Sequence, residues 1–224
     1  MIYLNGFTFP NAELEGNFFM SMKRTCYDSY YPFQILSRNR LERVEFEPVT
    51  VFYGGNGCGK STALNIIAET LGIARDSIYN KSNFFPDYVQ MCSATFIREI
   101  PENSRIITSD DVFDYMLNIR NLNEGIDHKR EEIFEEYLDN KYSKFQMRSM
   151  ADYDQLVKVN KSRSKTQSRY VRSELMDNVR EYSNGESAFK YFTEKIGENG
   201  LYLLDEPENS LSPKRQLELM KFIE

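Results

Sequence analysis

The feature that most constrains this chain is a cluster of glycines followed at once by a lysine and two hydroxyl side chains. Residues 54–62 read GGNGCGKST, so that four of the eleven glycines fall within six positions. The run contains the pattern G-x-x-x-x-G-K-[ST], which belongs between a strand and a helix. Residues 49–53 are rich in β-branched and aromatic side chains, and residues 60–71 carry apolar side chains at helical spacing before Gly72. We therefore predict a strand, a tight loop and a helix capped by Gly72.

The loop chemistry indicates a polyphosphate site. Glycines allow backbone N–H groups to wrap around a phosphate, and the next helix directs its positive end at the anion. Lys60 can reach the β- and γ-phosphates, and the Ser61 hydroxyl can complete a Mg²⁺ shell. The residues assigned to nucleotide binding are Gly54, Gly55, Asn56, Gly57, Cys58, Gly59, Lys60, Ser61 and Thr62. Cys58 is interpreted either as a tolerated small residue or as a thiol whose alkylation blocks the site.

A second motif, LYLLDEP at residues 201–207, has four apolar residues followed by two acids and a proline. In a parallel sheet the carboxyl end of a strand opens onto the ligand crevice. We predict that Asp205 holds Mg²⁺ together with Ser61, and that Glu206 orients and deprotonates the attacking water. The alternative is that both acids form a helix cap or a solvated turn. Ser212 and Pro213 predict the start of a further helix.

Composition excludes several classes of protein. The 41% hydrophobic content, with 16 Phe and 15 Tyr, excludes a disordered chain. No apolar run approaches the roughly 20 residues of a membrane helix, and the N-terminus lacks a secretory signal. Three cysteines form no disulfide framework, which indicates a reducing cytoplasm, and a single histidine leaves few zinc ligands. The net charge of −6 does not indicate nucleic-acid binding by the chain as a whole.

Breaker residues predict the organisation of the chain. Val44 and Phe46 alternate with acids and predict a strand ending at Pro48. The interval from Pro101 to Pro207 has no proline and few glycines, so it is expected to be mostly helical, with a solvated helix at 127–145. We expect one domain, with a β-rich lobe and the glycine loop at 1–95, a helical insertion at 96–180, and a second strand and helix at 181–224.

Three motifs together resemble the head of an ABC-type ATPase: NGCGKST at 56–62, SNGES at 183–187 and LLDEPEN at 203–209. The resemblance covers residues from about 40 to 72 and 180 to 217, and is strongest to the AAA/ABC-like group that includes SMC, RecF, OLD-type and bacterial defence ATPases. It implies an α/β P-loop NTPase fold with a parallel core sheet, an N-terminal β-rich lobe and an inserted helical subdomain.

The resemblance also implies a mechanism. Two heads would pack head to tail around two ATP molecules, and Ser183, Gly185 and Glu186 of one head would cap the γ-phosphate held by the other head's Lys60. Read without the family, SNG at 183–185 is a capped turn before a helix. Gln90 is interpreted either as a glutamine that senses the γ-phosphate after a strand, or as a plain core-strand residue.

The chain departs from the family pattern at several positions. Asn184 and Ser212 stand where transporters carry a glycine and an aspartate, which favours the AAA/ABC-like group. The chain stops at Glu224, before the strand that carries the family's switch histidine, so we expect a truncated reading frame with uncertain activity on its own. Arg38, Arg40 and Arg43 are interpreted as contacts to nucleotide or a partner head, or as solvated charges.

A basic stretch precedes the SNGES motif. It contains six cations within fifteen residues and no acid: Lys158, Lys161, Arg163, Lys165, Arg169 and Arg172. Such a stretch is typical either of a contact to the DNA backbone, with salt-dependent affinity, or of a solvated segment.

These observations favour a Mg²⁺-dependent ATPase whose cycle makes and breaks a homodimer, in DNA maintenance or anti-phage defence. Two alternatives remain open: the ATP-binding subunit of a membrane transporter, and a non-hydrolysing module whose interactions are controlled by nucleotide. A small-molecule kinase is the least favoured, because it would have no use for the SNGES motif or for Glu206.

Overall fold

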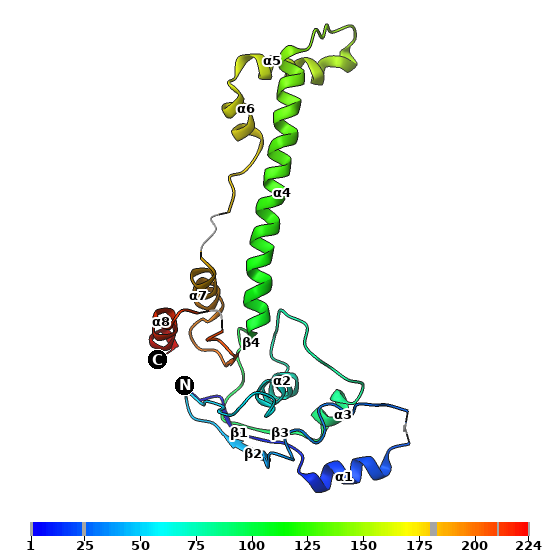
Figure 1. Cartoon of the computed structure of the whole chain (residues 1–224), viewed down its shortest axis with the longest axis vertical. Coiled ribbons are helices and arrows are strands. Elements are labelled where there is room, and N and C mark those ends of the chain that lie inside the picture. Colours follow the sequence, from blue (N-terminus) through cyan, green and yellow to red (C-terminus); the bar gives the residue numbers. More distant parts are fainter. Residues whose placement is uncertain (1, 24–25, 180–182, 210, 224) are drawn as a thin grey trace. The chain divides into compact units, whose positions relative to one another are not determined.

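The structure is a computed structural model of the chain and describes residues 2–23, 26–179, 183–209 and 211–223 (Figure 1). The chain forms two compact units. The first comprises Met1–Asp114 together with Asn184–Glu224, and the second comprises Tyr115–Ser183. The boundary that the sequence predicted at 180 and 181 lies outside the described residues.

The first unit contains an antiparallel sheet with the order β2-β1-β3. Its strands are β1 (Leu4–Thr8), β2 (Arg43–Glu45) and β3 (Ser93–Phe96). Phe7 lies opposite Val44 on one side and Ala94 on the other, and its ring is fully buried. The alternation of Val44 with polar neighbours therefore predicted β2 correctly, although the strand ends before Pro48.

Aromatic side chains fill the core beside this sheet. Helices α1 (Ala12–Ser21) and α3 (Phe85–Gln90) contribute to it, and Figure 1 shows α3 close to β3. The core includes Phe7, Phe9, Phe33, Phe84, Phe85 and Tyr88. Rings of this size bury a large apolar area. Through Phe33 and Leu36, residues 31–40, which lie between α1 and β2, are packed into this core.

A parallel pair of strands lies in the same unit. These are β4 (Arg105–Thr108) and β5 (Tyr202–Asp205), whose register sets Thr108 opposite Asp205. Helix α2 (Lys60–Leu71) packs against both strands. The prediction of this helix is confirmed at both ends, because it starts at Lys60 and its C-cap Gly72 adopts a left-handed φ of 64°.

Two further helices complete the first unit. Helix α7 (Asn184–Lys195) precedes β5 and α8 (Pro213–Ile223) follows it, and the two pack together. The start of α8 at Pro213 confirms the prediction made from Ser212 and Pro213, because proline at the first helical position loses no hydrogen bond.

The second unit is helical. Helix α4 (Ser109–Tyr142) continues into it from the first unit and is followed by a short 3₁₀ turn (Met150–Asp152), α5 (Tyr153–Ser164) and α6 (Gln167–Glu174). A small core of Ile133, Tyr137 and Tyr170 joins α6 to α4, and Figure 1 shows these helices beside one another.

Several expectations about secondary structure are wrong. Residues 49–53 form no strand; Val51 is 80% exposed and Tyr53 fully exposed, because no described strand pairs with this segment. Gln90 ends helix α3, so it neither follows a strand nor lies in one. The helix expected at 127–145 runs instead over Ser109–Tyr142, and the interval expected to be mostly helical also contains β4.

Candidate functional site

The glycine loop enters α2 through backbone conformations that glycine adopts more easily than any other residue. Gly57 and Gly59 have φ angles of 79° and 95°, in the region that disfavours side chains. A Cβ on Gly59 would stand 2.8 Å from Ile35 Cγ2 and 3.0 Å from Leu36 Cδ2. Gly59 therefore allows both the left-handed turn into α2 and the close approach of residues 31–40.

Lys60 turns back over the loop. Its Nζ donates to the carbonyl oxygen of Gly54 over 2.9 Å and to that of Gly55 over 3.1 Å. The ammonium is thereby held beside the N-terminus of α2, where both the charge and the helix dipole attract an anion. Lys60 and the turn formed by Gly57 and Gly59 are consistent with the predicted phosphate cradle.

Ser61 lies beside Asp205. The Ser61 hydroxyl, in the first turn of α2, donates to Oδ1 of Asp205 at the end of β5, over 3.0 Å. A hydroxyl and a carboxylate at this separation present two oxygen donors of the kind that Mg²⁺ binds, with water and phosphate filling its other positions. Among the described residues, no group of three His, Cys, Asp or Glu side chains could hold a metal, so such an ion would depend on this pair and on its nucleotide.

The electrostatics of Asp205 reflect its partly buried position. Burial raises the pKa of its carboxyl group, and the negative charges of Glu206 and Asp110 raise it further. The hydrogen bond from Ser61 and the positive charge of Lys60 act in the opposite direction. An added divalent cation would favour the ionised carboxylate, which is the form that ligates metal.

Glu206 occupies a turn directly after β5. Its φ of 50° is unusual for a residue with a side chain, and its Oε2 accepts a hydrogen bond from Asn209 Nδ2 over 2.5 Å. A left-handed non-glycine residue stores strain of roughly 1–3 kcal/mol, and such residues are concentrated at functional sites. The role of Glu206 as the base stays a prediction, because the only hydrogen bond described for its carboxylate is the one from Asn209.

Residues 31–40 form hydrogen bonds with the loop and with the start of α2, a role that the sequence did not reveal. Asn39 Nδ2 donates to the carbonyl oxygen of Cys58 over 3.0 Å, and the Tyr31 hydroxyl donates to Thr62 Oγ1 over 3.3 Å. Neither residue belongs to a motif, and no sequence pattern connects them with the loop. Cys58 is half-buried, and no contact favours either interpretation of its thiol.

The other predicted site residues are less closely tied to this arrangement. Gly185 and Glu186 lie in the first turn of α7, where Glu186 forms an ion pair of 3.8 Å with Arg215 on α8. Ser183 is the last residue of the second unit. Gln90 is exposed at the end of α3. Its role in γ-phosphate sensing stays a prediction.

The arginines before the loop differ in their surroundings. Arg38 donates to Gln34 Oε1 over 2.7 Å, Arg43 forms an ion pair of 3.5 Å with Glu45, and Arg40 has a left-handed φ of 57°. All three side chains lie at the surface. The solvated interpretation is therefore the simpler one.

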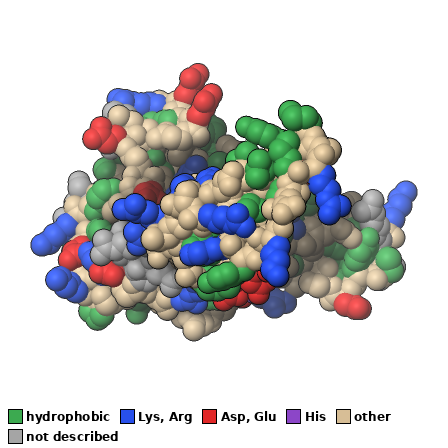
Figure 2. Space-filling view, turned by 90° about the horizontal axis from the view of Figure 1, so that it is seen from above, with side chains coloured by type: hydrophobic (Ala, Val, Ile, Leu, Met, Phe, Trp, Pro, Cys, Tyr) green, Lys and Arg blue, Asp and Glu red, His purple; other side chains and the backbone are tan. Residues whose placement is uncertain are grey.

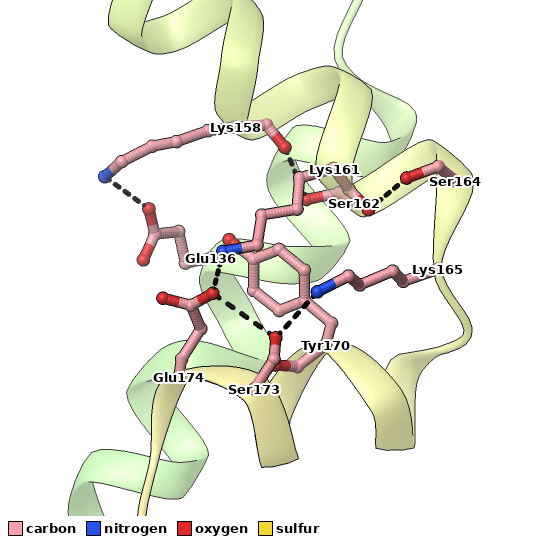
Figure 3. A network of polar contacts seen from close by, with 9 residues as sticks. All are labelled: Glu136, Lys158, Lys161, Ser162, Ser164, Lys165, Tyr170, Ser173 and Glu174. Atoms are coloured by element: carbon pink, nitrogen blue, oxygen red, sulfur yellow. Dashed lines mark hydrogen bonds and ion pairs between the residues drawn. The ribbon is translucent and has the colours of Figure 1, made fainter.

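The lysines of the basic stretch contact neighbouring side chains in the second unit (Figure 3). Lys158 pairs with Glu136 on α4 over 2.6 Å, Lys161 pairs with Glu174 on α6, and Lys165 donates to Ser173 over 3.0 Å. Arg163 donates to the Ser143 carbonyl oxygen over 2.6 Å. Figure 2 shows Lys and Arg side chains in several places, with acidic and hydrophobic groups between them. These contacts do not support a DNA-binding surface.

Comparison with known proteins identifies one family. The sequence model of the family described as "ABC transporter" matches residues 42–209, which includes the glycine loop, α7 and the Asp205–Glu206 turn. No curated protein and no solved structure matches the chain. In the part of the chain that the structure describes, no helix combines the length and the apolar character needed to cross a membrane.

Proposed function

The chain belongs to the ABC transporter family, and on that premise we propose that it is a Mg²⁺-dependent ATPase head that dimerises around ATP. The single observation that carries this proposal is the contact between Ser61 and Asp205, which joins the loop motif to the acidic strand end. An unrelated glycine turn and an unrelated acidic turn would have no reason to meet in this geometry.

The residues of the site suggest a division of roles. The backbone N–H groups of the loop and the Lys60 ammonium would bind the β- and γ-phosphates and stabilise the charge that develops on them. Ser61 and Asp205 would hold Mg²⁺, which neutralises phosphate charge when it is bound. Glu206 would accept a proton from the attacking water.

Dimerisation would complete the site. Ser183, Gly185 and Glu186 would cap the γ-phosphate held by the Lys60 of a second copy, so that ATP bridges the two heads. The family membership and the position of Gly185 and Glu186 in the first turn of α7 support this arrangement, because the positive end of a helix dipole attracts an anion. We further propose a role in DNA maintenance or anti-phage defence and a reducing cytoplasmic setting, which suits the free Cys26, Cys58 and Cys92.

The ATP-binding subunit of a membrane transporter is a second candidate. The description of the matching family favours it, and such a subunit would require a separate membrane-spanning partner. Asn184 and Ser212, which replace residues usual in transporters, argue for the first candidate. Recovery of an integral membrane protein with the affinity-purified chain would favour the transporter assignment.

Release of inorganic phosphate from ATP tests the proposed function. We expect the unchanged protein to release phosphate in the presence of Mg²⁺, and both EDTA and the substitution Glu206→Gln to stop the release while ATP still binds. Binding of ATP without any phosphate release would favour instead a non-hydrolysing module controlled by nucleotide.

A further inference from the structure

A polar network begins in the segment just after α2. The Arg75 guanidinium donates from Nη1 to Asn65 Oδ1 over 2.8 Å and from Nε to the carbonyl oxygen of Ser77 over 2.9 Å. The same group lies 3.9 Å from the centre of the Tyr79 ring. Two directional hydrogen bonds and a stacked ring fix the guanidinium in one orientation, which a lysine could not reproduce.

The first branch of this network reaches the helix that carries Ser61. Asn65 is a buried residue of α2, four positions after Ser61. Residues at this spacing lie on the same side of a helix, one turn apart. The bond from Arg75 to Asn65 therefore holds the turn of α2 that follows Ser61.

The second branch reaches the strand beside Asp205. The hydroxyls of Ser77 and Thr108 are 3.2 Å apart, and Thr108 donates its proton to Asp111 Oδ2 over 2.8 Å. Because Thr108 uses its proton in this way, Ser77 is the donor to Thr108. Thr108 is in turn the register partner of Asp205 across the β4–β5 pair.

The charged groups around Arg75 also connect it with the Asp205 side of the site. Burial lowers the pKa of Arg75, while Tyr79 and the carboxylates of Asp111, Glu69 and Asp205 raise it. Asp111 is only 3% exposed, and its Oδ1 has no hydrogen-bond partner among the described residues. Arg75 thus lies within electrostatic range of Asp205 and of the buried Asp111 carboxylate in the first turn of α4.

We propose that Arg75 is a positioning residue for the metal site, which holds α2 against β4 and thereby sets the separation between Ser61 and Asp205. The inference rests on the proposed function, since it concerns how the same site takes up Mg²⁺. The contacts described for Arg75 are with Asn65, Ser77 and Tyr79 and include neither the phosphate loop nor Ser61 or Asp205, so its loss should weaken metal binding and leave the phosphate cradle intact. Residues that orient metal ligands typically change metal affinity by roughly 10–100-fold when removed.

The test measures binding of a fluorescent ATP analogue against Mg²⁺ concentration, and again in EDTA. For Arg75→Gln we expect the Mg²⁺ midpoint to rise by about tenfold or more, with affinity in EDTA within about twofold of the unchanged protein. Arg75→Lys should restore little, because lysine lacks the paired donors. The matched control is Arg98→Gln, which removes an exposed arginine of the first unit that follows β3; its Mg²⁺ midpoint should stay unchanged.

The outcomes separate this inference from the proposed function. An unchanged Mg²⁺ midpoint in Arg75→Gln, or an equal loss of affinity in EDTA, would overturn the role of Arg75 alone. Failure of the unchanged protein to bind the analogue under any condition would overturn the proposed function itself. If Arg75→Gln does not fold, Ser77→Ala removes the link to Thr108 while leaving the guanidinium in place, and the same shift, smaller in size, is required of it.

Discussion

The Ser61 hydroxyl donates a hydrogen bond of 3.0 Å to Asp205, although 144 positions separate the two residues in the chain. The contact joins the first turn of α2 to the carboxyl end of β5. Folding thus brings together the two motifs that the sequence assigned to magnesium binding.

Replacing Lys60 by alanine should weaken nucleotide binding by about 100-fold, because charge-assisted hydrogen bonds to phosphate contribute about 1.5–3 kcal/mol each. Titration calorimetry with ATP measures the change. Lys129→Ala provides the control, since Lys129 pairs with Glu132 on the exposed surface of α4. Equal affinities for the Lys60 variant and the control would contradict the assignment.

Replacing Glu206 by glutamine should preserve ATP binding and trap an ATP-bound dimer, because the phosphate contacts remain while the base is lost. Size-exclusion chromatography with light scattering, with and without Mg²⁺ and ATP, measures the mass. Glu208→Gln is the matched control, an acid two positions further on that is exposed to solvent. A Glu206→Gln protein that stays monomeric under both conditions would argue against the head-to-tail dimer.

Asp205→Asn should stabilise the metal-free protein while it weakens Mg²⁺-dependent binding. Burial raises the pKa of Asp205 above its unfolded value, so its ionised form opposes folding. This contribution lowers stability as the pH rises from below the unfolded pKa to above the folded one, and the full cost is present at neutral pH. We expect the melting temperature of the metal-free protein at pH 7 to be higher for Asp205→Asn than for the unchanged protein.

Differential scanning fluorimetry across pH tests this sign. The gain from Asp205→Asn should disappear below the unfolded pKa, where the aspartate of the unchanged protein is neutral in both the folded and unfolded states. A variant that melts below the unchanged protein at pH 7 would contradict the electrostatic account of Asp205.

Gly59→Ala should destabilise the first unit by about 1–3 kcal/mol, because a left-handed φ and a contact of 2.8 Å with Ile35 both resist a Cβ. Chemical denaturation followed by circular dichroism measures the loss. Gly125→Ala in α4 is the contrasting control, since a Cβ there meets nothing within 4 Å. That change should stabilise the helix by about 0.5–1 kcal/mol.

Neutralising Lys161, Arg163 and Lys165 together should leave duplex-DNA binding unchanged and lower the thermal stability of the second unit. The three side chains contact Glu174, Ser143 and Ser173 respectively, so their loss removes internal contacts (Figure 3). Fluorescence anisotropy with labelled duplex DNA at low salt provides the measurement. A salt-dependent affinity that the triple variant abolishes would restore the DNA-binding interpretation.

Local signals in the sequence predicted the parts of the fold that local interactions determine. Helix α2 and its cap at Gly72 follow from apolar spacing and glycine, and α8 follows from Ser212 and Pro213. Strands were harder to predict, because a strand depends on partners distant in sequence. Residues 49–53 have the composition of a strand but form none and are mostly exposed, while the four residues of β4 gave too short a signal.

In the candidate site, too, some residues could be predicted from the sequence and others could not. Lys60, Ser61, Asp205 and Glu206 could be assigned from motifs because their chemistry demands particular residue types at particular spacings. Asn39, which supports the loop at Cys58, could not be found in this way, because an asparagine with a carbonyl partner leaves no pattern in the sequence.

Binding of Mn²⁺·ATP, followed by electron paramagnetic resonance, tests most directly whether Ser61 and Asp205 hold the metal of a bound nucleotide. We predict saturable binding of one Mn²⁺·ATP per chain, a large loss of affinity for Mn²⁺·ATP in Asp205→Asn, and unchanged binding of metal-free ATP by that variant. Absence of saturable binding by the unchanged protein, or full affinity for Mn²⁺·ATP in the variant, would contradict the account.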